Sequence, residues 1–325
     1  MNPFSPLDGE ALLLHLQPQR HGIRGKFIPN IDLTKVTWFR AGGKGELFFQ
    51  PVDEEDLLAF LAILPPEIPL TIVGLGTNLL IRDGGIKGVI LRLSSKGFGG
   101  LEQINEREIC AGAGVSDKRL AAFACERGVG GFHFFHGVPG GVGGAVAMNA
   151  GANGLETSQR VVSVRMVNRK GKITTLPVEE LGYSYRQSCL PKNTIVLSAV
   201  LAGEKALPHE IEACMQEVTR HRTQAQPVRE KTGGSTFKNL KEISAWQALD
   251  QAGCRGLTIG GAQFSSLHCN FMVNLGYATA YDLELLGESA RARVFEKLGL
   301  RLEWEIKRLG QFAKGYEVSP FDNTQ

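Results

Sequence analysis

Three short motifs carry polar side chains suited to acid–base or electrostatic chemistry: "GGSTFKN" with Ser235, "YSYRQS" with Arg186 and "LEWEIKRLG" with Glu305. A serine hydroxyl can serve as a nucleophile, a phosphate ligand, a helix cap or, rarely, an acid. The planar guanidinium of an arginine matches the two oxygens of a carboxylate. Glu305 lies in an apolar, strand-like run, where loss of water favours the protonated carboxyl. The ordinary alternatives are a cap or phosphate contact, a surface ion pair and a solvated carboxylate at a strand edge.

Two glycine-rich loops are the second chemical feature. The chain has 40 glycines in 325 residues, against an average of about 7%. Gly74 and Gly76 follow an apolar run in "VGLGTNLL". The stretch "HGVPGGVGGAVAMNAGANG" holds seven more around Pro139: Gly137, Gly140, Gly141, Gly143, Gly144, Gly151 and Gly154. Main-chain N–H groups without a neighbouring Cβ can form nests for phosphate oxygens, so two loops predict a ligand with two phosphates. Tight turns without a ligand are the alternative.

Neither loop matches the commoner phosphate motifs. No Walker-type Lys-Ser/Thr pair follows either loop, and Leu79 occupies the place of the third glycine in a dinucleotide-binding G-x-G-x-x-G. His133 and His136 in "HFFH" could suggest a metal. No Asp, Glu or Cys nearby completes a ligand set, so we expect no metal site.

Composition limits the class of protein. The 36 Lys and Arg nearly balance the 33 Asp and Glu, and the lack of a basic block argues against a nucleic-acid-binding protein. Six cysteines without a C-x-x-C motif, no signal peptide and no long apolar run predict a cytoplasmic protein with reduced thiols and no membrane insertion. The near-neutral charge and the lack of an apolar stripe predict a monomer. The length suits two domains.

Strand-like and helical patterns alternate, which is typical of an α/β architecture. Residues 1–35 are Pro-rich and are predicted to form an irregular arm. Strands are expected at 45–51, 69–76, 87–93, in a hairpin of 161–168 with 172–177, at 194–203 and at 301–310. Helices are expected at 53–64, 116–128 and 209–222, with later ones beginning near Ser244 and Thr279.

Six motifs, in order, resemble those of the UDP-N-acetylenolpyruvoylglucosamine reductases, the MurB family of flavoenzymes. They are "VGLGTNLL", "HGVPGGVGGAVAMNAGANG", "YSYRQS", "GGSTFKN", "GGAQFSSLHCNF" and "LEWEIKRLG". The resemblance implies a mixed α+β and α/β fold, with a two-lobed FAD-binding region of the vanillyl-alcohol-oxidase (PCMH) type and a C-terminal α/β substrate-binding domain. The absence of an insertion after "NAGANG" is typical of the shorter, type II form.

The corresponding domain division has four parts: an arm at 1–35, an FAD-binding domain at 36–205 with lobes at about 36–100 and 101–205, a substrate-binding domain at 206–312 and a tail at 313–325.

The resemblance implies an NADPH-dependent, FAD-mediated reduction of UDP-N-acetylglucosamine enolpyruvate to UDP-N-acetylmuramate, a step of peptidoglycan precursor synthesis. Side chains cannot supply a hydride, so a flavin or a nicotinamide must carry it. Charge that builds toward the substrate carboxylate requires a fixed cation and a hydrogen-bond donor. The family's catalytic arginine and glutamate fall on Arg186 and Glu305, and its proton-donating serine falls on Ser235.

The resemblance also assigns binding residues. For noncovalent FAD they are Gly74, Gly76, Thr77, Asn78, Leu79, Pro139, Gly140, Gly143, Gly144, Asn149 and Gly151. For the substrate they are Tyr185, Lys238, Asn239, Gln263 and His268. Lys238 and Asn239 would meet the sugar or the diphosphate, and Tyr185 would either stack on a ring or fill the core. His136, just before a flavin loop, is the kind of residue through which related oxidases bind flavin covalently.

Four positions depart from the family pattern: Thr77 for a serine, Gly141 for a threonine or serine, Leu240 for a proline and Leu267 for a lysine. The last change removes a cation that could contact a substrate phosphate, and Arg229 or Lys231 could compensate. Two other functions stay open. One is another FAD-dependent oxidase or dehydrogenase of the same fold. The other is a non-catalytic nucleotide-binding protein, against which the intact Ser235, Arg186 and Glu305 argue.

Overall fold

The first lobe is built on a four-stranded sheet of mixed direction. The computed structural model describes residues 8–321, and its first sheet has the order β1-β2-β5-β3. These strands are β1 (Lys26–Asp32), β2 (Lys44–Gln50), β3 (Leu70–Ile72) and β5 (Ile86–Leu91). The last three run parallel, so their carboxyl ends meet at one edge. Helix α2 (Glu54–Ile63), capped by Asp53, buries Leu57 and Phe60 against one face.

The N-terminal segment is not the irregular arm that the sequence predicted. Helix α1 (Gly9–Leu16) is followed by the 3-10 turn η1 (Pro18–His21) and by β1, which pairs along its length with β2. Leu16 and Ile23 belong to the core of the first lobe. The prediction was wrong because a Pro-rich composition was taken as a sign of irregular structure, whereas β1 is an edge strand, which tolerates a residue without an N–H such as Pro29. Residues 1–7 of the predicted arm lie outside the described residues.

The second lobe contains a five-stranded antiparallel sheet. Its order is β12-β11-β13-β7-β6, formed by β6 (Leu101–Gln103), β7 (Glu108–Gly112), β11 (Val161–Asn168), β12 (Ile173–Pro177) and β13 (Thr194–Ala202). The predicted hairpin of β11 with β12 is confirmed. The main helical segments of the second lobe are α4 (Asp117–Glu126), η3 (His133–Gly137) and α5 (Val142–Met148). Ser116 caps α4 by accepting a bond from the Arg119 N–H, as the sequence predicted.

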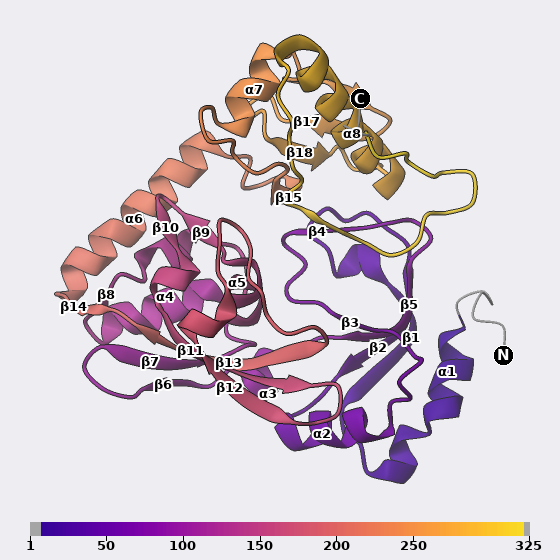
Figure 1. Ribbon diagram of the computed structural model, residues 1–325, viewed down its shortest axis with the longest axis vertical. Helices are drawn as coiled ribbons and strands as arrows, with labels where there is room; N and C mark the ends of the chain where they lie inside the picture. The colour runs from indigo at the N-terminus through magenta and orange to yellow at the C-terminus, as the bar shows by residue number, and fades with distance from the viewer. Residues whose placement is uncertain (1–7, 322–325) are drawn as a thin grey trace.

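Helix α6 (Pro208–Ala225) leads from the second lobe to the C-terminal domain (Figure 1). Its apolar side packs on the second lobe, because Ile211 and Met215 belong to that lobe's core. The division at residue 205/206 remains a prediction, but the helix after it shares the core of the lobe before it. Within residues 8–321, no helix combines the length and apolar character needed to cross a membrane.

The C-terminal domain has a small antiparallel sheet covered by two helices. The strand order is β15-β18-β17-β16, with β15 (Lys231–Ser235), β16 (Thr258–Ile259), β17 (Ala262–Phe264) and β18 (Phe271–Asn274). Helices α7 (Ala245–Gln251) and α8 (Ala280–Leu298) begin directly after Ser244 and Thr279. These starts confirm the predicted positions at which the two helices begin.

The last strand is shorter than predicted and joins a different lobe. Only β19 (Lys307–Leu309) is extended within the expected 301–310, and it pairs in parallel with β4 (Leu79–Ile81) of the first lobe. Apolar alternation could not predict a partner so distant in the sequence. The chain then returns to α8, where the N–H of Phe321 donates to Glu288. Residues 322–325 of the predicted tail lie outside the described residues.

A buried ion network fixes α8 to the first lobe. Arg82 donates through two nitrogens to Glu284, both at 2.9 Å. Arg308 donates to Glu284 at 3.1 Å and to Glu288 at 2.8 Å. Asp83, which follows Arg82 in the sequence, accepts bonds from the first two N–H groups of α8 at 3.0 and 2.8 Å. The first lobe and the C-terminal domain are therefore held together by both charge and strand pairing.

Candidate active site

Arg186 stands at the tip of a tight turn in the second lobe. Ser184 and Gln187 exchange two main-chain hydrogen bonds of 3.0 Å, and Arg186 between them has a left-handed φ of 56°. Its Nε donates to Glu305 Oε1 at 3.2 Å, Nη1 to Glu156 Oε1 at 2.8 Å and Nη2 to the Gly151 carbonyl at 3.0 Å. A guanidinium has five N–H groups, so two remain for a ligand.

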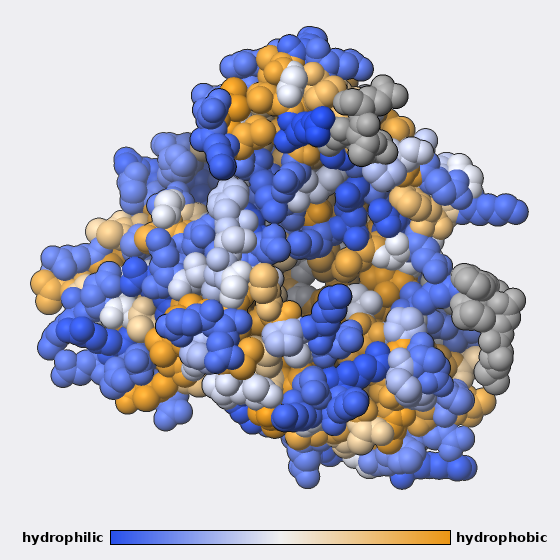
Figure 2. Space-filling view, in the orientation of Figure 1, coloured by the Kyte–Doolittle hydropathy of each residue, from blue (hydrophilic) through white to orange (hydrophobic). Residues whose placement is uncertain are grey.

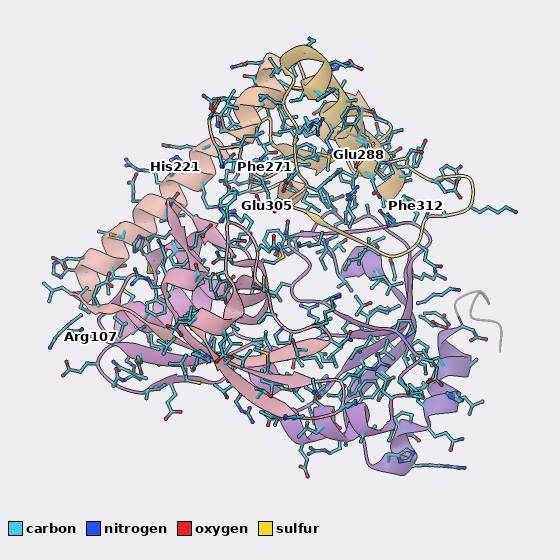
Figure 3. The ribbon with its side chains drawn as sticks, in the orientation of Figure 1. Arg107, His221, Phe271, Glu288, Glu305 and Phe312 are labelled. Carbon is cyan, nitrogen blue, oxygen red and sulfur yellow. The ribbon has the colours of Figure 1, made fainter. Side chains whose placement is uncertain are left out.

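Glu305 contacts Arg186 from the C-terminal domain. Figure 3 shows Glu305 at the edge of the C-terminal domain that faces the two lobes. Its side chain is 18% exposed. Burial raises the pKa of the Glu305 carboxyl, and Arg186 opposes that shift without overcoming it. The structure therefore brings together the two predicted residues and favours the neutral form of Glu305.

Ser235 precedes the residue whose main chain is hydrogen-bonded to Glu305. It ends β15, and the carbonyl of the next residue, Thr236, accepts the N–H of Glu305 at 2.9 Å. The described residues offer the Ser235 hydroxyl no hydrogen-bond partner, so the hydroxyl caps no helix. Gly233 is required behind it, since a Cβ there would stand 2.3 Å from the ring of Phe39.

The sequence analysis missed Glu156, which binds Arg186 more closely than Glu305 does. Glu156 Oε2 also accepts a bond of 2.9 Å from Asn149 Nδ2. Asn149 is buried and its amide bonds further to Ser184 and Ser158. A Cβ on Gly151 would stand 2.9 Å from Arg186 Nη1. Asn149 and Gly151, both predicted to bind the cofactor, thus use these groups to support Arg186. Only the position of Glu156 at the end of the glycine stretch could have drawn attention to it.

The two glycine loops meet, as a shared ligand requires. A Cβ built on Gly140 would lie 3.9 Å from Thr77 Oγ1. Gly76 has a φ of 72°, and its Cβ would collide with the Val36 carbonyl at 2.2 Å, so this loop needs glycine. At Gly74 and Gly144, by contrast, a Cβ would meet no protein atom within 4 Å. The protein thus leaves no room for a side chain at Gly76, whereas the space beside Gly74 and Gly144 is open. Such an open space fits the diphosphate of a flavin dinucleotide.

Two ionisable residues near the loops also fit an anionic ligand. The N–H of Asp117 donates to the Gly140 carbonyl, and its fully buried carboxyl has no partner among the described residues. Burial raises the pKa of Asp117 well above its usual range, which disfavours a negative charge on this carboxyl near the loop.

Arg92 is the second ionisable residue. It follows β5 at the carboxyl edge of the parallel strands, where Val73 bonds to Leu91 just before Gly74. Side chains alternate along a strand, so Arg92 shares the face of Ile90 and Val73. Burial lowers the pKa of its guanidinium, and no side-chain partner for it exists among residues 8–321. Because a single arginine after an apolar strand forms no motif, the sequence analysis missed it.

Four of the predicted substrate residues make contacts within the protein, and these contacts differ from residue to residue. The ring of Tyr185 lies 4.7 Å beneath the Arg186 guanidinium, and Lys238 Nζ is 3.4 Å from Glu303. Asn239 accepts a bond from the first N–H of α7, and Gln263 donates to Thr258 Oγ1 at 2.9 Å. Tyr185 thus contacts the arginine that binds Glu305, and the charge of Lys238 acts on the Glu305 carboxyl.

The remaining substrate residue is His268. Its ring packs edge-on against Phe271 at 4.8 Å, and burial lowers its pKa. Its neighbour Leu267, which stands where the family has a lysine, is 53% exposed. Arg229 and Lys231, considered as substitutes for that lysine, are both exposed.

The two histidines of "HFFH" form no described hydrogen bond or ion pair with Ser235, Arg186 or Glu305. They line two surface depressions of about 540 and 360 Å³ between η3 and α6, His133 with Cys214 and His221, and His136 with Glu212 and Met215. In the described part of the chain no three His, Cys, Asp or Glu residues are grouped as a metal site. Figure 2 shows the surface also hollowed at the centre, where the C-terminal domain meets the two lobes.

Comparison with known proteins agrees with this geometry. Residues 46–177 match a family model described as an FAD binding domain, and residues 226–309 match the model described as UDP-N-acetylenolpyruvoylglucosamine reductase, C-terminal domain. The structure of 6-hydroxy-D-nicotine oxidase from Arthrobacter nicotinovorans matches with a TM-score of 0.45 and 17% identity, over 57% of this chain and 43% of that one, and no argument rests on it.

A second solved structure covers almost the whole molecule. The crystal structure of UDP-N-acetylenolpyruvylglucosamine reductase (MurB) from Thermus caldophilus matches with a TM-score of 0.75 and 32% identity, over 88% of this chain and 99% of that one. The predicted fold class, an FAD-binding region followed by a C-terminal substrate domain, is confirmed, and the cofactor is FAD. Since identity at this level extends over nearly the full length of both proteins, the chain belongs to the UDP-N-acetylenolpyruvoylglucosamine reductase (MurB) family.

Proposed function

We propose that this FAD-dependent oxidoreductase reduces UDP-N-acetylglucosamine enolpyruvate to UDP-N-acetylmuramate, with NADPH as the reductant of the flavin. The observation that carries the proposal is the 3.2 Å contact of Arg186 with Glu305. The two residues are 119 positions apart in the sequence and come from different parts of the fold. Their meeting places a cation beside a carboxyl whose pKa is raised by burial, a pair suited to an enolpyruvyl carboxylate.

Arg186 binds and orients the carboxylate of the substrate. Two of its N–H groups are free of protein partners, and paired N–H donors match two carboxylate oxygens. Burial raises the pKa of Glu305, and in its protonated form this carboxyl donates a hydrogen bond to the same carboxylate as negative charge builds on it. Both groups are fixed before the substrate arrives, so little reorganisation is needed.

Ser235 holds the proton for the second half of the reaction. Bound FAD, once reduced by NADPH, would supply the hydride to one alkene carbon. The proton must then reach the other carbon, and the unpartnered Ser235 hydroxyl next to the Glu305 segment is the donor. A hydroxyl is a weak acid, which suffices because the carbon it protonates is strongly basic.

Apart from that of Arg92, the remaining assignments are proposed from the family to which the chain belongs. The two glycine loops and Arg92 would hold FAD without a covalent bond, while Tyr185, Lys238, Asn239, Gln263 and His268 would contact the nucleotide sugar. The substrate and NADPH are small molecules, and the reaction belongs to peptidoglycan precursor synthesis in the cytoplasm. We propose that the chain acts as a monomer and binds no nucleic acid.

The test is a half-reaction without oxygen. The protein's flavin is reduced with NADPH, UDP-N-acetylglucosamine enolpyruvate is added, and reoxidation is followed by flavin absorbance. We expect Ser235→Ala to slow reoxidation by about a hundredfold or more, because general acid catalysis is typically worth about 10²–10⁴-fold. Ser266→Ala is the matched control, since Ser266 is an exposed serine of the same domain whose hydroxyl makes no hydrogen bond among the described residues.

Each outcome separates one part of the proposal from the rest. If the reduced wild-type flavin ignores the substrate, the reductase function is wrong, and oxidation of an alcohol or lactone by the same protein would then support the oxidase alternative. If Ser235→Ala reoxidises at the wild-type rate, the function stands but another group delivers the proton.

A further inference from the structure

We propose that Glu156 is a positioning residue that serves as the permanent counter-ion of Arg186 and thereby leaves Glu305 in its neutral, hydrogen-bond-donating form. This inference rests on the proposed function, in which a neutral Glu305 faces the substrate carboxylate. It assigns a role to a residue outside the predicted catalytic group. The evidence is the arrangement of two carboxyl groups around one guanidinium.

The two carboxyl groups contact different nitrogens of Arg186. Glu156 Oε1 accepts from Nη1 at 2.8 Å, whereas Glu305 Oε1 accepts from Nε at 3.2 Å. The shorter contact is in the range of charge-assisted bonds and the longer one is not. Both contacts are within ion-pair distance, and Glu156 is the closer partner of Arg186.

A second donor stabilises the charge on Glu156. Asn149 Nδ2 donates to Glu156 Oε2 at 2.9 Å, so each oxygen of this carboxylate has its own donor. The carboxyl of Glu305 has one donor only, and its surroundings are more buried. If one of the two carboxyl groups must be neutral, it is Glu305.

One of them must be neutral once the substrate binds. Two ionised carboxylates and a substrate carboxylate would place three negative charges on a single arginine, and like charges at such distances cannot all be ionised without a large energetic cost. A charged Glu156 therefore lets Arg186 bind the substrate while Glu305 keeps its proton.

The other charges near Glu305 leave this assignment unchanged. Arg186 and Lys238 both favour the ionised form of Glu305, but Lys238 also lies 3.4 Å from Glu303. From the described part of the first lobe, the neutral amide of Asn78 donates to the Glu305 carbonyl at 3.1 Å. Burial is the largest influence and raises the pKa of Glu305, and the charge of Glu156 acts in the same direction.

The experiment measures the pH dependence of substrate-driven flavin reoxidation in the holoenzyme. The active form has a protonated Glu305, so the rate falls as pH rises through the pKa of that carboxyl. Glu156→Gln removes the neighbouring negative charge, which lowers the pKa and moves this fall to lower pH. We expect the ratio of wild-type to variant rates to grow about tenfold from the acidic to the alkaline side of the profile, as a shift of one unit would produce.

Three further variants make the result specific. Glu156→Asp keeps the charge and should keep the wild-type position of the fall even if the overall rate drops. Glu305→Gln cannot titrate and should abolish the fall. Glu204→Gln, which breaks an Arg160–Glu204 pair of 2.8 Å in the same lobe, should leave the profile in place. Equal loss of rate by Glu156→Gln at every pH would reduce Glu156 to a structural support and overturn the proposal.

A direct titration separates this inference from the proposed function. The ¹³C carboxyl resonance of Glu305, identified by its absence from Glu305→Gln, is followed with pH in the wild type and in Glu156→Gln. We expect wild-type Glu305 to titrate above the ordinary glutamate range and the variant to titrate at lower pH. If wild-type Glu305 titrates in the ordinary glutamate range, the inference is wrong even if turnover is normal. A shifted titration that depends on Glu156 supports it even if the substrate proves to be another.

Discussion

At the tip of the Ser184–Gln187 turn, one arginine is held in a backbone conformation that non-glycine residues rarely adopt. A left-handed φ at such a residue costs on the order of 1–3 kcal/mol, and Arg186 has a φ of 56°. Its three side-chain contacts offset that cost and fix the guanidinium in one direction. The strain is therefore part of how the site is preorganised.

Arg92 gives a prediction at the same scale. Arg92→Met removes the unpaired cation at the edge of the cofactor loops while keeping the apolar stem. A hydrogen bond to a charged group is worth about 1.5–3 kcal/mol, so we expect FAD to bind the variant about tenfold more weakly or worse. The measurement is a titration of the apoprotein with FAD, followed by flavin fluorescence.

The control for this titration is Arg107→Met. Arg107 is exposed at the far end of the second lobe (Figure 3) and should leave the affinity for FAD unchanged. A steep salt dependence should accompany FAD binding to the wild type and weaken in Arg92→Met. Equal affinities of wild type and Arg92→Met would show that Arg92 faces another ligand or none.

The sequence was informative for residues with distinctive types and uninformative for their supports. Ser235, Arg186 and Glu305 stand in motifs, and the structure brings Arg186 and Glu305 together. Glu156 and Arg92 stand in no motif, because their roles depend on which distant groups they meet after folding. A carboxylate in a glycine stretch has the same appearance in sequence whether it faces solvent or an arginine.

At the scale of elements, local signals predicted helices well and distant pairings poorly. Helices α4, α7 and α8 begin where Ser116, Ser244 and Thr279 predicted, because a cap depends on nearby residues only. The strand β1 and the partner of β19 were missed. Their stability comes from β2 and β4, which the sequence of the strands themselves cannot reveal.

Asp83 gives the prediction at this scale. Its carboxylate accepts the N–H groups of Ala280 and Tyr281 at the start of α8, from a loop almost 200 residues earlier. Asp83→Ala leaves both groups without this partner, so we expect the free energy of unfolding to fall by about 1–2 kcal/mol. Urea unfolding followed by tryptophan fluorescence measures this loss.

Glu106→Ala serves as the reference for Asp83→Ala, since Glu106 is an exposed acidic residue without a described partner. It should change the unfolding free energy by no more than about 0.5 kcal/mol. A loss for Asp83→Ala of the same small size would mean that Thr279 alone caps α8.

At the scale of the whole molecule, the network around Glu284 joins the first lobe to the C-terminal domain. The Glu284 side chain is 2% exposed and receives donors from Arg82 and Arg308. Removal of one member of a buried ion pair costs about 3–5 kcal/mol, and the partial exposure of both arginines places the expectation near 3 kcal/mol. We therefore expect Glu284→Ala to lower the unfolding free energy by about that amount.

The comparison for Glu284→Ala is Glu217→Ala, which breaks an exposed pair with Arg220 on α6. Exposed pairs contribute about 0–1 kcal/mol, so its effect should be small. Limited proteolysis should cleave Glu284→Ala faster than wild type near residues 310–321, which return along α8. If both variants unfold alike, the network does not hold the interface.

The bond between Asn78 and the Glu305 carbonyl also has a consequence for synthesis. The two residues are 227 positions apart, and β4 and β19 pair beside them. A chain made from its N-terminus cannot complete the loop at Gly74 to Leu79 until nearly all of the protein has been translated. Contacts of such separation form late and slowly. During synthesis β4 of the first lobe therefore stays unpaired until β19 has been made. A chain truncated before residue 307 lacks β19 and cannot complete the loop at Gly74 to Leu79.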